Sequence, residues 1–209
     1  MSIAPSRVFI SLALAGVLVL SGCAATQIVN QWSNPEYPSH SFKKTMVIGI
    51  SKQTSIRRTF EDEFVAQLRS AGVDAVPSYR YIKEDAQVPE PRLKEAVIQA
   101  GADGAVITRL VRVERKTDVT PGYYDVPPPF GFYGWYSHAW NGYYEPPRVY
   151  QYEVYISETS LYDMIKNEVV WTGSLETRAP GNIRDEIKKY AETVIQALRE
   201  NHLLGPGSS

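Results

Sequence analysis

Short apolar runs alternate with segments of helical spacing over the first half of the chain. The run Thr45–Ile50 is rich in β-branched residues and predicts a buried strand. Apolar residues then recur every four positions from Ile56 to Leu68, which predicts a helix that ends near Ser70. The same two signals repeat in a short strand at Val73–Pro77 and a helix that starts at Pro91 and stops at Gly101.

A third strand, Ala105–Glu114, completes the order strand, helix, strand, helix, strand, which is typical of an α/β layer with parallel strands. Further on, Val149–Leu161 alternates as a long strand, and 163–167 form a tight turn into a return strand at Glu168–Thr172. Apolar residues at three-four spacing over Asn182–Arg199 predict a covering helix.

We therefore predict one domain of α/β class over residues 45–204, with a mixed sheet of about five strands. Its order is βαβαβ, then an antiparallel hairpin, then a C-terminal helix. Leu203 and Leu204 are expected to close over the core, and residues 205–209 to form a flexible tail.

The periodicity breaks over residues 116–148, which we expect to form a long insertion. This segment is rich in Pro and Gly, and 12 of the chain's 24 aromatic residues lie between Tyr123 and Tyr152. A loop of this length is usually functional or disordered. Exposed Tyr and Trp suit sugar stacking, protein contacts and bilayer interfaces, so the insertion is the candidate contact surface. Its candidate contact residues are Tyr133, Trp135, Tyr136, Trp140, Tyr143 and Tyr144. The alternative is a loop that packs only on itself.

The segment Ala24–Lys44 shows no sustained periodicity and is interpreted as a tether. Trp32 is its exception: it either packs back on the domain, which we favour, or starts an edge strand.

The N-terminus has the layout of a signal peptide. Arg7 precedes an apolar run, Val8–Leu20, that is shorter than the about 20 residues a spanning helix needs. The run ends in Leu20-Ser21-Gly22-Cys23, which looks like a lipobox. We expect residues 1–22 to be a lipoprotein signal peptide that is cleaved between Gly22 and Cys23. Residues 23–44 are then a lipidated N-terminus and tether. The alternative is a buried core helix.

An acylated Cys23 makes the membrane a partner, because two or more acyl chains give stable anchoring. Ala24 follows the cysteine; by resemblance to Gram-negative lipoproteins, this implies the outer membrane, with the domain facing the periplasm.

Charge and residue types exclude several function classes. The formal net charge is −1, or about −2 without Arg7, so nucleic acid is not an expected partner. Cys23 is the only cysteine, and the three histidines, His40, His138 and His202, are scattered; we expect no metal site and no cofactor.

Catalytic signatures are also lacking, so we expect no enzyme. The chain has no Gly-x-Ser-x-Gly elbow and no phosphate-binding Gly-Lys-Ser/Thr loop. The carboxylate pairs Glu61-Asp62 and Asp185-Glu186 are expected on solvated helix faces.

The turn after the first strand is a candidate anion contact through Lys52, Arg57 and Arg58, because helix N-termini favour anions. We favour the alternative, in which the two arginines pair with Glu61 and Asp62 one turn on.

Several short motifs extend over most of the chain that follows the signal. They are Val47-Ile48-Gly49-Ile50, Arg57-Arg58-Thr59-Phe60-Glu61-Asp62, Ala75-Val76-Pro77-Ser78-Tyr79, Ala102-Asp103-Gly104, Leu161-Tyr162-Asp163 and Val170-Trp171. With the lipobox and Trp32, they resemble a family of uncharacterised Gram-negative outer-membrane lipoproteins. The element order is also similar to that of envelope-assembly lipoproteins such as the curli-secretion lipoprotein and penicillin-binding-protein activators. The family resemblance implies no known reaction.

We therefore expect a non-catalytic binding or envelope-assembly protein that acts on an envelope protein or polysaccharide through the aromatic segment. The alternatives are a lipid-anchored enzyme or binding module for cell-wall glycans, and a structural envelope component without a discrete site.

Overall fold

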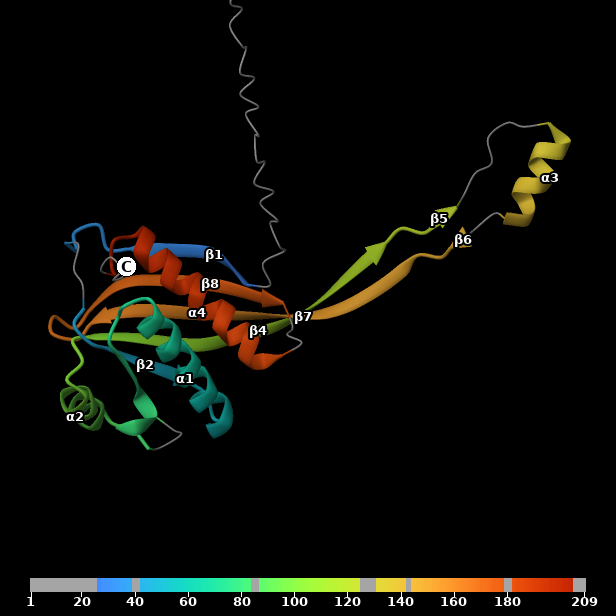
Figure 1. The fold of residues 1–209 in the computed structure, drawn as a ribbon. Coiled ribbons are helices and arrows are strands. Elements are labelled where there is room, and N and C mark those ends of the chain that lie inside the picture. Colours follow the sequence, from blue (N-terminus) through green and yellow to red (C-terminus); the bar gives the residue numbers. More distant parts are fainter. Residues whose placement is uncertain are drawn as a thin grey trace, which may run out of the picture.

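A mixed six-stranded sheet forms the body of the molecule (Figure 1). The computed structural model describes residues 26–38, 42–83, 87–124, 131–141, 144–178 and 182–204. The strands are β1 (Thr26–Ser33), β2 (Thr45–Ile50), β3 (Ala75–Pro77), β4 (Gly104–Thr120), β5 (Tyr123–Tyr124), β6 (Tyr144–Glu145), β7 (Arg148–Asp163) and β8 (Glu168–Arg178). The helices are α1 (Thr54–Ser70), the short 3-10 turn η1 (Ser78–Arg80), α2 (Glu90–Ala100), α3 (Phe132–Asn141) and α4 (Ile183–Glu200).

The strand order in the sheet is β1-β8-β7-β4-β2-β3. β2 pairs in parallel with β3 and β4, as crossover helices require, and the other neighbours are antiparallel. The predicted α/β class, the parallel βαβαβ unit, the hairpin and the C-terminal helix are confirmed.

The main core lies between the sheet and the pair α1 and α4, which cover one face (Figure 1). Trp171, Phe64 and Leu198 are among its fully buried side chains. Leu203 and Leu204 are buried in the same cluster, as predicted. A smaller cluster around Met46 and Val97 packs α2 on the opposite face.

The segment expected to be a tether contains strand β1. Its whole length pairs with β8, and the Trp171 Nε1–H donates to Gln31 Oε1 at 3.2 Å. Trp32 therefore lies in an edge strand, where it is 47% exposed, rather than packed in the core. The tether interpretation was wrong for residues 26–33, because most side chains of this edge strand are exposed and no run of apolar residues marks it.

The segment expected to be an irregular insertion begins and ends as a regular ribbon. β4 and β7 pair from Gly104↔Asp163 to Thr120↔Arg148, with one register shift between Leu110 and Arg112. β2 accompanies β4 only as far as Arg109, and β8 accompanies β7 only from Val154. Beyond those positions the two strands project from the body, and α3 lies at their far end (Figure 1). We call residues 114–154 the arm.

Candidate functional site

The arm presents most of the aromatic residues that the sequence singled out. Beyond the β5–β6 pair lies α3, which carries no Lys, Arg, Asp or Glu. The side chains of Phe132, Tyr133, Trp135, Tyr136 and Trp140 on this helix are between 52% and 86% exposed. Tyr144 in β6 is 60% exposed. Of the predicted contact residues, Tyr143 lies outside the described residues.

Rings on α3 also pack on one another. The ring centroid of Tyr136 lies 6.3 Å from that of Phe132 and 6.2 Å from that of Trp140. These tilted and edge-on contacts agree in part with the alternative of a loop that packs only on itself. They nevertheless leave each of the three residues more than half exposed. The helix therefore offers a row of pre-ordered aromatic faces.

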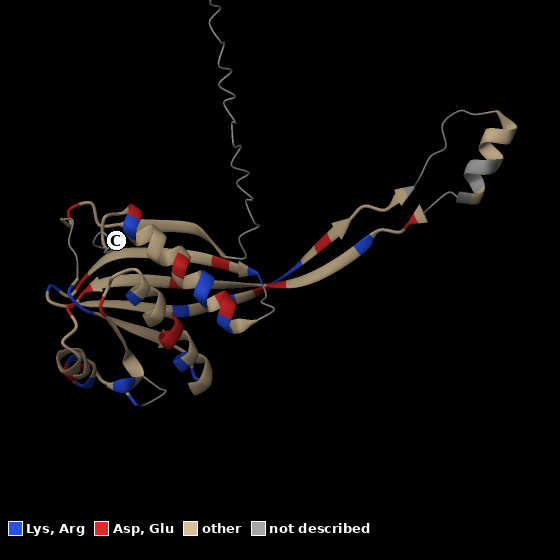
Figure 2. Cartoon of the chain, in the orientation of Figure 1, with Lys and Arg blue, Asp and Glu red and all other residues tan. Residues whose placement is uncertain are grey.

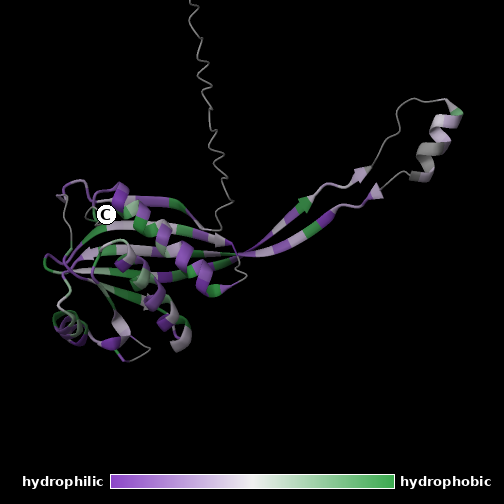
Figure 3. Cartoon of the chain, in the orientation of Figure 1, coloured by the Kyte–Doolittle hydropathy of each residue, from purple (hydrophilic) through white to green (hydrophobic). Residues whose placement is uncertain are grey.

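The shaft of the arm is charged where the tip is not (Figure 2). Arg115 pairs with Glu153 across the two strands at 3.7 Å, Lys116 pairs with Glu176 at 3.7 Å, and Arg148 pairs with Glu145. Apolar positions such as Val119 and Val149 are exposed between these charges (Figure 3). The arm thus has a mixed polar shaft and an uncharged aromatic tip.

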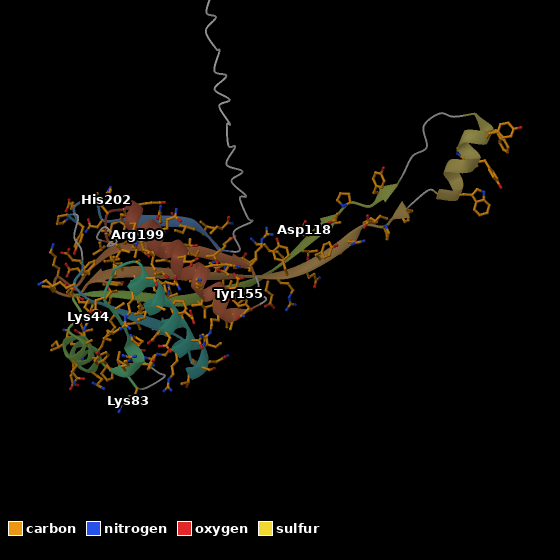
Figure 4. The ribbon with its side chains drawn as sticks, viewed as in Figure 1. Lys44, Lys83, Asp118, Tyr155, Arg199 and His202 are labelled. Atoms are coloured by element: carbon orange, nitrogen blue, oxygen red, sulfur yellow. The ribbon has the colours of Figure 1, made fainter. Side chains whose placement is uncertain are left out.

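A cavity of about 450 Å³ lies at the base of the arm, beside Tyr155 (Figure 4). It opens where β2 ends, where the parallel pairing of β2 with β4 stops at Arg109, and where α1 and α4 begin. The carboxyl ends of parallel strands are the usual place for ligands in open α/β sheets. Its walls are mainly apolar, with Ile50, Ile56, Phe60, Leu110, Tyr155, Ile183 and Ile187 among the lining residues. Sequence reasoning identified only the Ser51–Arg58 side of this cavity, because the other side comes from β7, β8 and α4.

Hydroxyl groups form the floor of the cavity. The Tyr190 hydroxyl accepts from Ser157 Oγ at 3.1 Å and shares a 2.7 Å hydrogen bond with Thr159, which is bonded in turn to Thr108 at 2.7 Å. Burial raises the pKa of Tyr190, although the hydrogen bonds act in the opposite direction. Because these hydroxyls already hydrogen-bond to one another, their role is to order the floor of the cavity rather than to bind a ligand.

The cavity has one carboxylate in its lining, Glu186. Lys189 Nζ donates to its Oε1 at 3.2 Å, whereas the buried Oε2 has no hydrogen-bond partner within the described part of the chain. We expected Glu186 on a solvated helix face, and its 13% side-chain exposure corrects that. Glycoside hydrolysis normally uses two carboxyl groups, and the lining supplies one. The cavity suits an apolar group that offers a hydrogen-bond donor.

Of the three predicted anion contacts, Lys52 and Arg57 line the cavity, and Arg58 is not part of its lining. Arg57 is 5% exposed, and its Nε donates to Glu61 Oε1 at 3.0 Å while Nη2 donates to Ser78 Oγ and the Ile82 carbonyl. The guanidinium of Arg58 lies 5.5 Å from the ring centroid of Tyr79, and Lys52 lines the cavity. The favoured alternative, pairing of Arg57 with Glu61, is present; an anion contact at Lys52 or Arg58 stays a prediction.

Glu61 corrects a second expectation about solvated carboxylates. It is fully buried, and its two oxygens accept hydrogen bonds from β2, α1 and η1. Its role is structural, since four donors surround it.

The predicted anchor residues Gly22 and Cys23 lie outside the described residues, so lipidation stays a prediction. Among residues 26–204 that the structure describes, no His, Cys, Asp or Glu side chains gather as a possible metal site. None of the described helices is long and apolar enough to cross a membrane.

No protein-family model and no curated protein matches this chain. Among solved structures it is similar to a PelC dodecamer from Paraburkholderia phytofirmans, with 13% identity over 83% of this chain and 95% of that chain and a TM-score of 0.44. It is also similar to lipoprotein GNA1162 from Neisseria meningitidis, with 10% identity over 76% of this chain and 96% of that chain and a TM-score of 0.41. These values describe a loose likeness in backbone arrangement, and no function is inferred from them.

Proposed function

We propose that this chain is a lipid-anchored lipoprotein of the outer membrane, facing the periplasm, and a non-catalytic binding protein that acts through its arm. The lipobox at Cys23 supports the anchor. The arm supports the binding proposal, because it is the part of the described chain that contributes no residue to the hydrophobic clusters of the body.

An isolated two-stranded ribbon has little stability in water without a covering surface. The arm nevertheless keeps a regular register to Thr120↔Arg148 and places aromatic faces at its end. Exposed clusters of large apolar residues mark interaction sites in soluble domains. The arm is therefore built to contact another component of the envelope.

The cavity supports a binding role over an enzymatic one, because its lining has a single carboxylate and ordered hydroxyls. The second candidate, a binding module for cell-wall glycans, is favoured by the exposed rings of Trp135 and Trp140, which have the flat faces that stack on sugars.

The test uses a photo-crosslinking amino acid at Tyr133 in living cells, with the same substitution at Ile165 as a control. Ile165 is 81% exposed on the turn between β7 and β8, at the end of the body away from the arm. We expect capture from Tyr133 that Ile165 does not give. Equal capture from the two positions, or no capture of protein, glycan or lipid from Tyr133, would contradict an arm-mediated function.

A matched variant removes the arm and keeps the body. An Asn-Gly turn replaces Lys116–Tyr152 after the Arg115↔Glu153 pair, since this dipeptide closes a two-residue hairpin. We expect the variant to show the same envelope defect as deletion of the whole chain. A wild-type envelope would show that the arm is dispensable.

The anchor has its own test. Mass spectrometry of the mature N-terminus should show an acylated Cys23, and Cys23→Ala should prevent signal cleavage and acylation. A mature protein without acyl chains in wild-type cells would refute the anchor.

A further inference from the structure

We propose that the tip of the arm is a second membrane contact, in which the aromatic face of α3 lies in the interface of the same bilayer that holds Cys23. This inference rests on the proposed lipidation and names the partner of the arm as the lipid surface. Three features of the molecule lead to it: the position of β1, the length of the arm and the distribution of charge.

The position of β1 puts the anchor and the arm at the same end of the sheet. Thr26, the first residue of β1, is paired with Thr177, which is paired with Tyr155, which is paired with Val113. These four residues form one row across the sheet, and the arm begins immediately after Val113. The C-terminal end of α4, marked by His202, lies at the opposite end of the body (Figure 4).

The chain between Cys23 and Thr26 is short. Three residues span at most about 11 Å when fully extended. The bilayer that holds an acylated Cys23 must therefore lie close to the row of residues that ends in Val113. A tether that ran to Lys44 would have imposed no such limit.

The arm is longer than the about 11 Å that the chain from Cys23 to Thr26 can span. The strand from Val113 to Thr120 adds seven residues, roughly 24 Å at about 3.4 Å per residue, and α3 lies farther out. An arm that leaves the same end of the sheet and exceeds the reach of Cys23–Thr26 is long enough to lie along the bilayer surface or to enter it.

The charge distribution along the arm decides how deeply its shaft and its tip enter the bilayer. Glu114, Arg115 and Asp118 keep the shaft among headgroups, because burying charged side chains in hydrocarbon is costly. From Val126 to Tyr144 the chain has eight aromatic residues and no Lys, Arg, Asp or Glu. Tyr and Trp are enriched at membrane interfaces, where one end of each ring is apolar and the other is polar.

The base of the arm has matching apolar positions. Ile50, Leu110 and Ile183 border the cavity and are 46% to 56% exposed. An exposed apolar rim at this end suits a surface held against lipid better than one facing open solvent.

The test uses the mature, acylated protein reconstituted into vesicles of phosphatidylethanolamine and phosphatidylglycerol. All variants carry Trp32→Phe, which removes the exposed tryptophan of β1. The remaining reporters are Trp135 and Trp140 on α3 and the fully buried Trp171. Lipids brominated near the headgroup end of the acyl chain quench only tryptophans that reach the interface.

We expect brominated lipid to lower the tryptophan emission at least twofold. Quenching should disappear in Trp135→Phe with Trp140→Phe, whose emission comes from Trp171 alone. Trp140→Glu should reduce quenching of Trp135 severalfold, because a charge on the tip opposes insertion. The matched control, Ile98→Glu on α2, should leave quenching unchanged; Ile98 is 78% exposed and lies outside the arm.

Emission that brominated lipid leaves unchanged, with aqueous iodide quenching all but the contribution of the buried Trp171, would overturn this inference. If Tyr133 also captured an envelope protein or glycan, the arm-mediated function would stand with a different partner. If Cys23 carried no acyl chain, the anchor would fail instead, so the two failures are distinguishable.

Discussion

Glu61 is a residue whose environment could not be read from its helical position. Its Oε1 accepts from the Gly49 amide at 3.0 Å, from Arg57 Nε at 3.0 Å and from Ser78 Oγ at 2.7 Å, and its Oε2 accepts from the Tyr79 amide at 2.9 Å. The carboxylate thus joins α1 to β2 and η1. Removing one partner of a buried ion pair leaves the other charge without compensation.

We predict that Glu61→Ala lowers the free energy of unfolding by about 3–5 kcal/mol, measured by urea denaturation. The control is Asp62→Ala on the exposed side of α1, where the loss of the hydrogen bond from Tyr79 should cost about 1 kcal/mol. Equal losses in the two variants would contradict the structural role assigned to Glu61.

Asp163 gives the protein a pH-dependent contact between the segment after β1 and the β7–β8 turn. The Tyr37 hydroxyl donates to its Oδ2 at 2.7 Å, and the Ile165 and Lys166 amides donate to its Oδ1 at 2.8 and 2.9 Å. Burial alone would raise the pKa of Asp163. Hydrogen bonds from the Lys166 amide, the Tyr37 hydroxyl and the Ile165 amide outweigh burial and hold the pKa below its ordinary value of 3.8.

A carboxyl group with a lowered pKa in the folded state stabilises the fold above its unfolded pKa and loses that contribution as the pH falls through the folded value. We predict that the free energy of unfolding of the wild type falls more steeply than that of Asp163→Asn between about pH 5 and about pH 2. Parallel curves from urea denaturation at each pH would refute this.

At the scale of elements, the arm is separable from the body. The body keeps its core without the arm, because the clusters around Phe64 and Met46 contain no residue between Arg115 and Glu153. The shaft contributes exposed ion pairs such as Lys116–Glu176, which are worth little.

We therefore predict that replacing Lys116–Tyr152 by Asn-Gly changes the free energy of unfolding by no more than about 1 kcal/mol. Thermal and urea denaturation measure this. A large loss of stability would mean that the arm folds back on the body, contrary to the observed projection in Figure 1.

At the scale of the whole molecule, the short chain between Cys23 and Thr26 couples the anchor to the arm. A flexible insert of ten Gly and Ser residues after Ala25 adds a root-mean-square span of about 17 Å. The effective concentration of the tip at the bilayer should fall roughly tenfold as the reachable volume grows.

We predict weaker quenching by brominated lipid in this insertion variant than in the parent protein. The same insert placed after Leu204, at the opposite end of the body, serves as the control and should have no effect. Equal quenching in the two variants would show that the short connection does not hold the tip at the membrane.

The helices and the parallel strands could be predicted because each buries one face. Ile187, Tyr190 and Val194 in α4 follow the three-four spacing that such burial requires, and all three are buried. β7 was predicted almost to its outer end, from Val149, but β1 and the outer half of β4 could not be predicted in the same way. Their side chains are largely solvated on both faces, so no apolar alternation records the strand.

By itself the sequence determined the helices and strands that bury one face in the body, the α/β class and the uncharged aromatic composition of the arm tip, because these depend on spacing and residue type along the chain. Only the tertiary structure decided that Glu61 and Glu186 are buried, that a cavity lies between α1, α4 and the sheet, and that Thr26 and the arm share one end. The buried carboxylates and the cavity depend on how the helices pack on the sheet. The shared end depends on strand register between residues far apart in sequence, as in Thr26↔Thr177 and Val113↔Tyr155. Hydrophobic periodicity carries no information about such pairings.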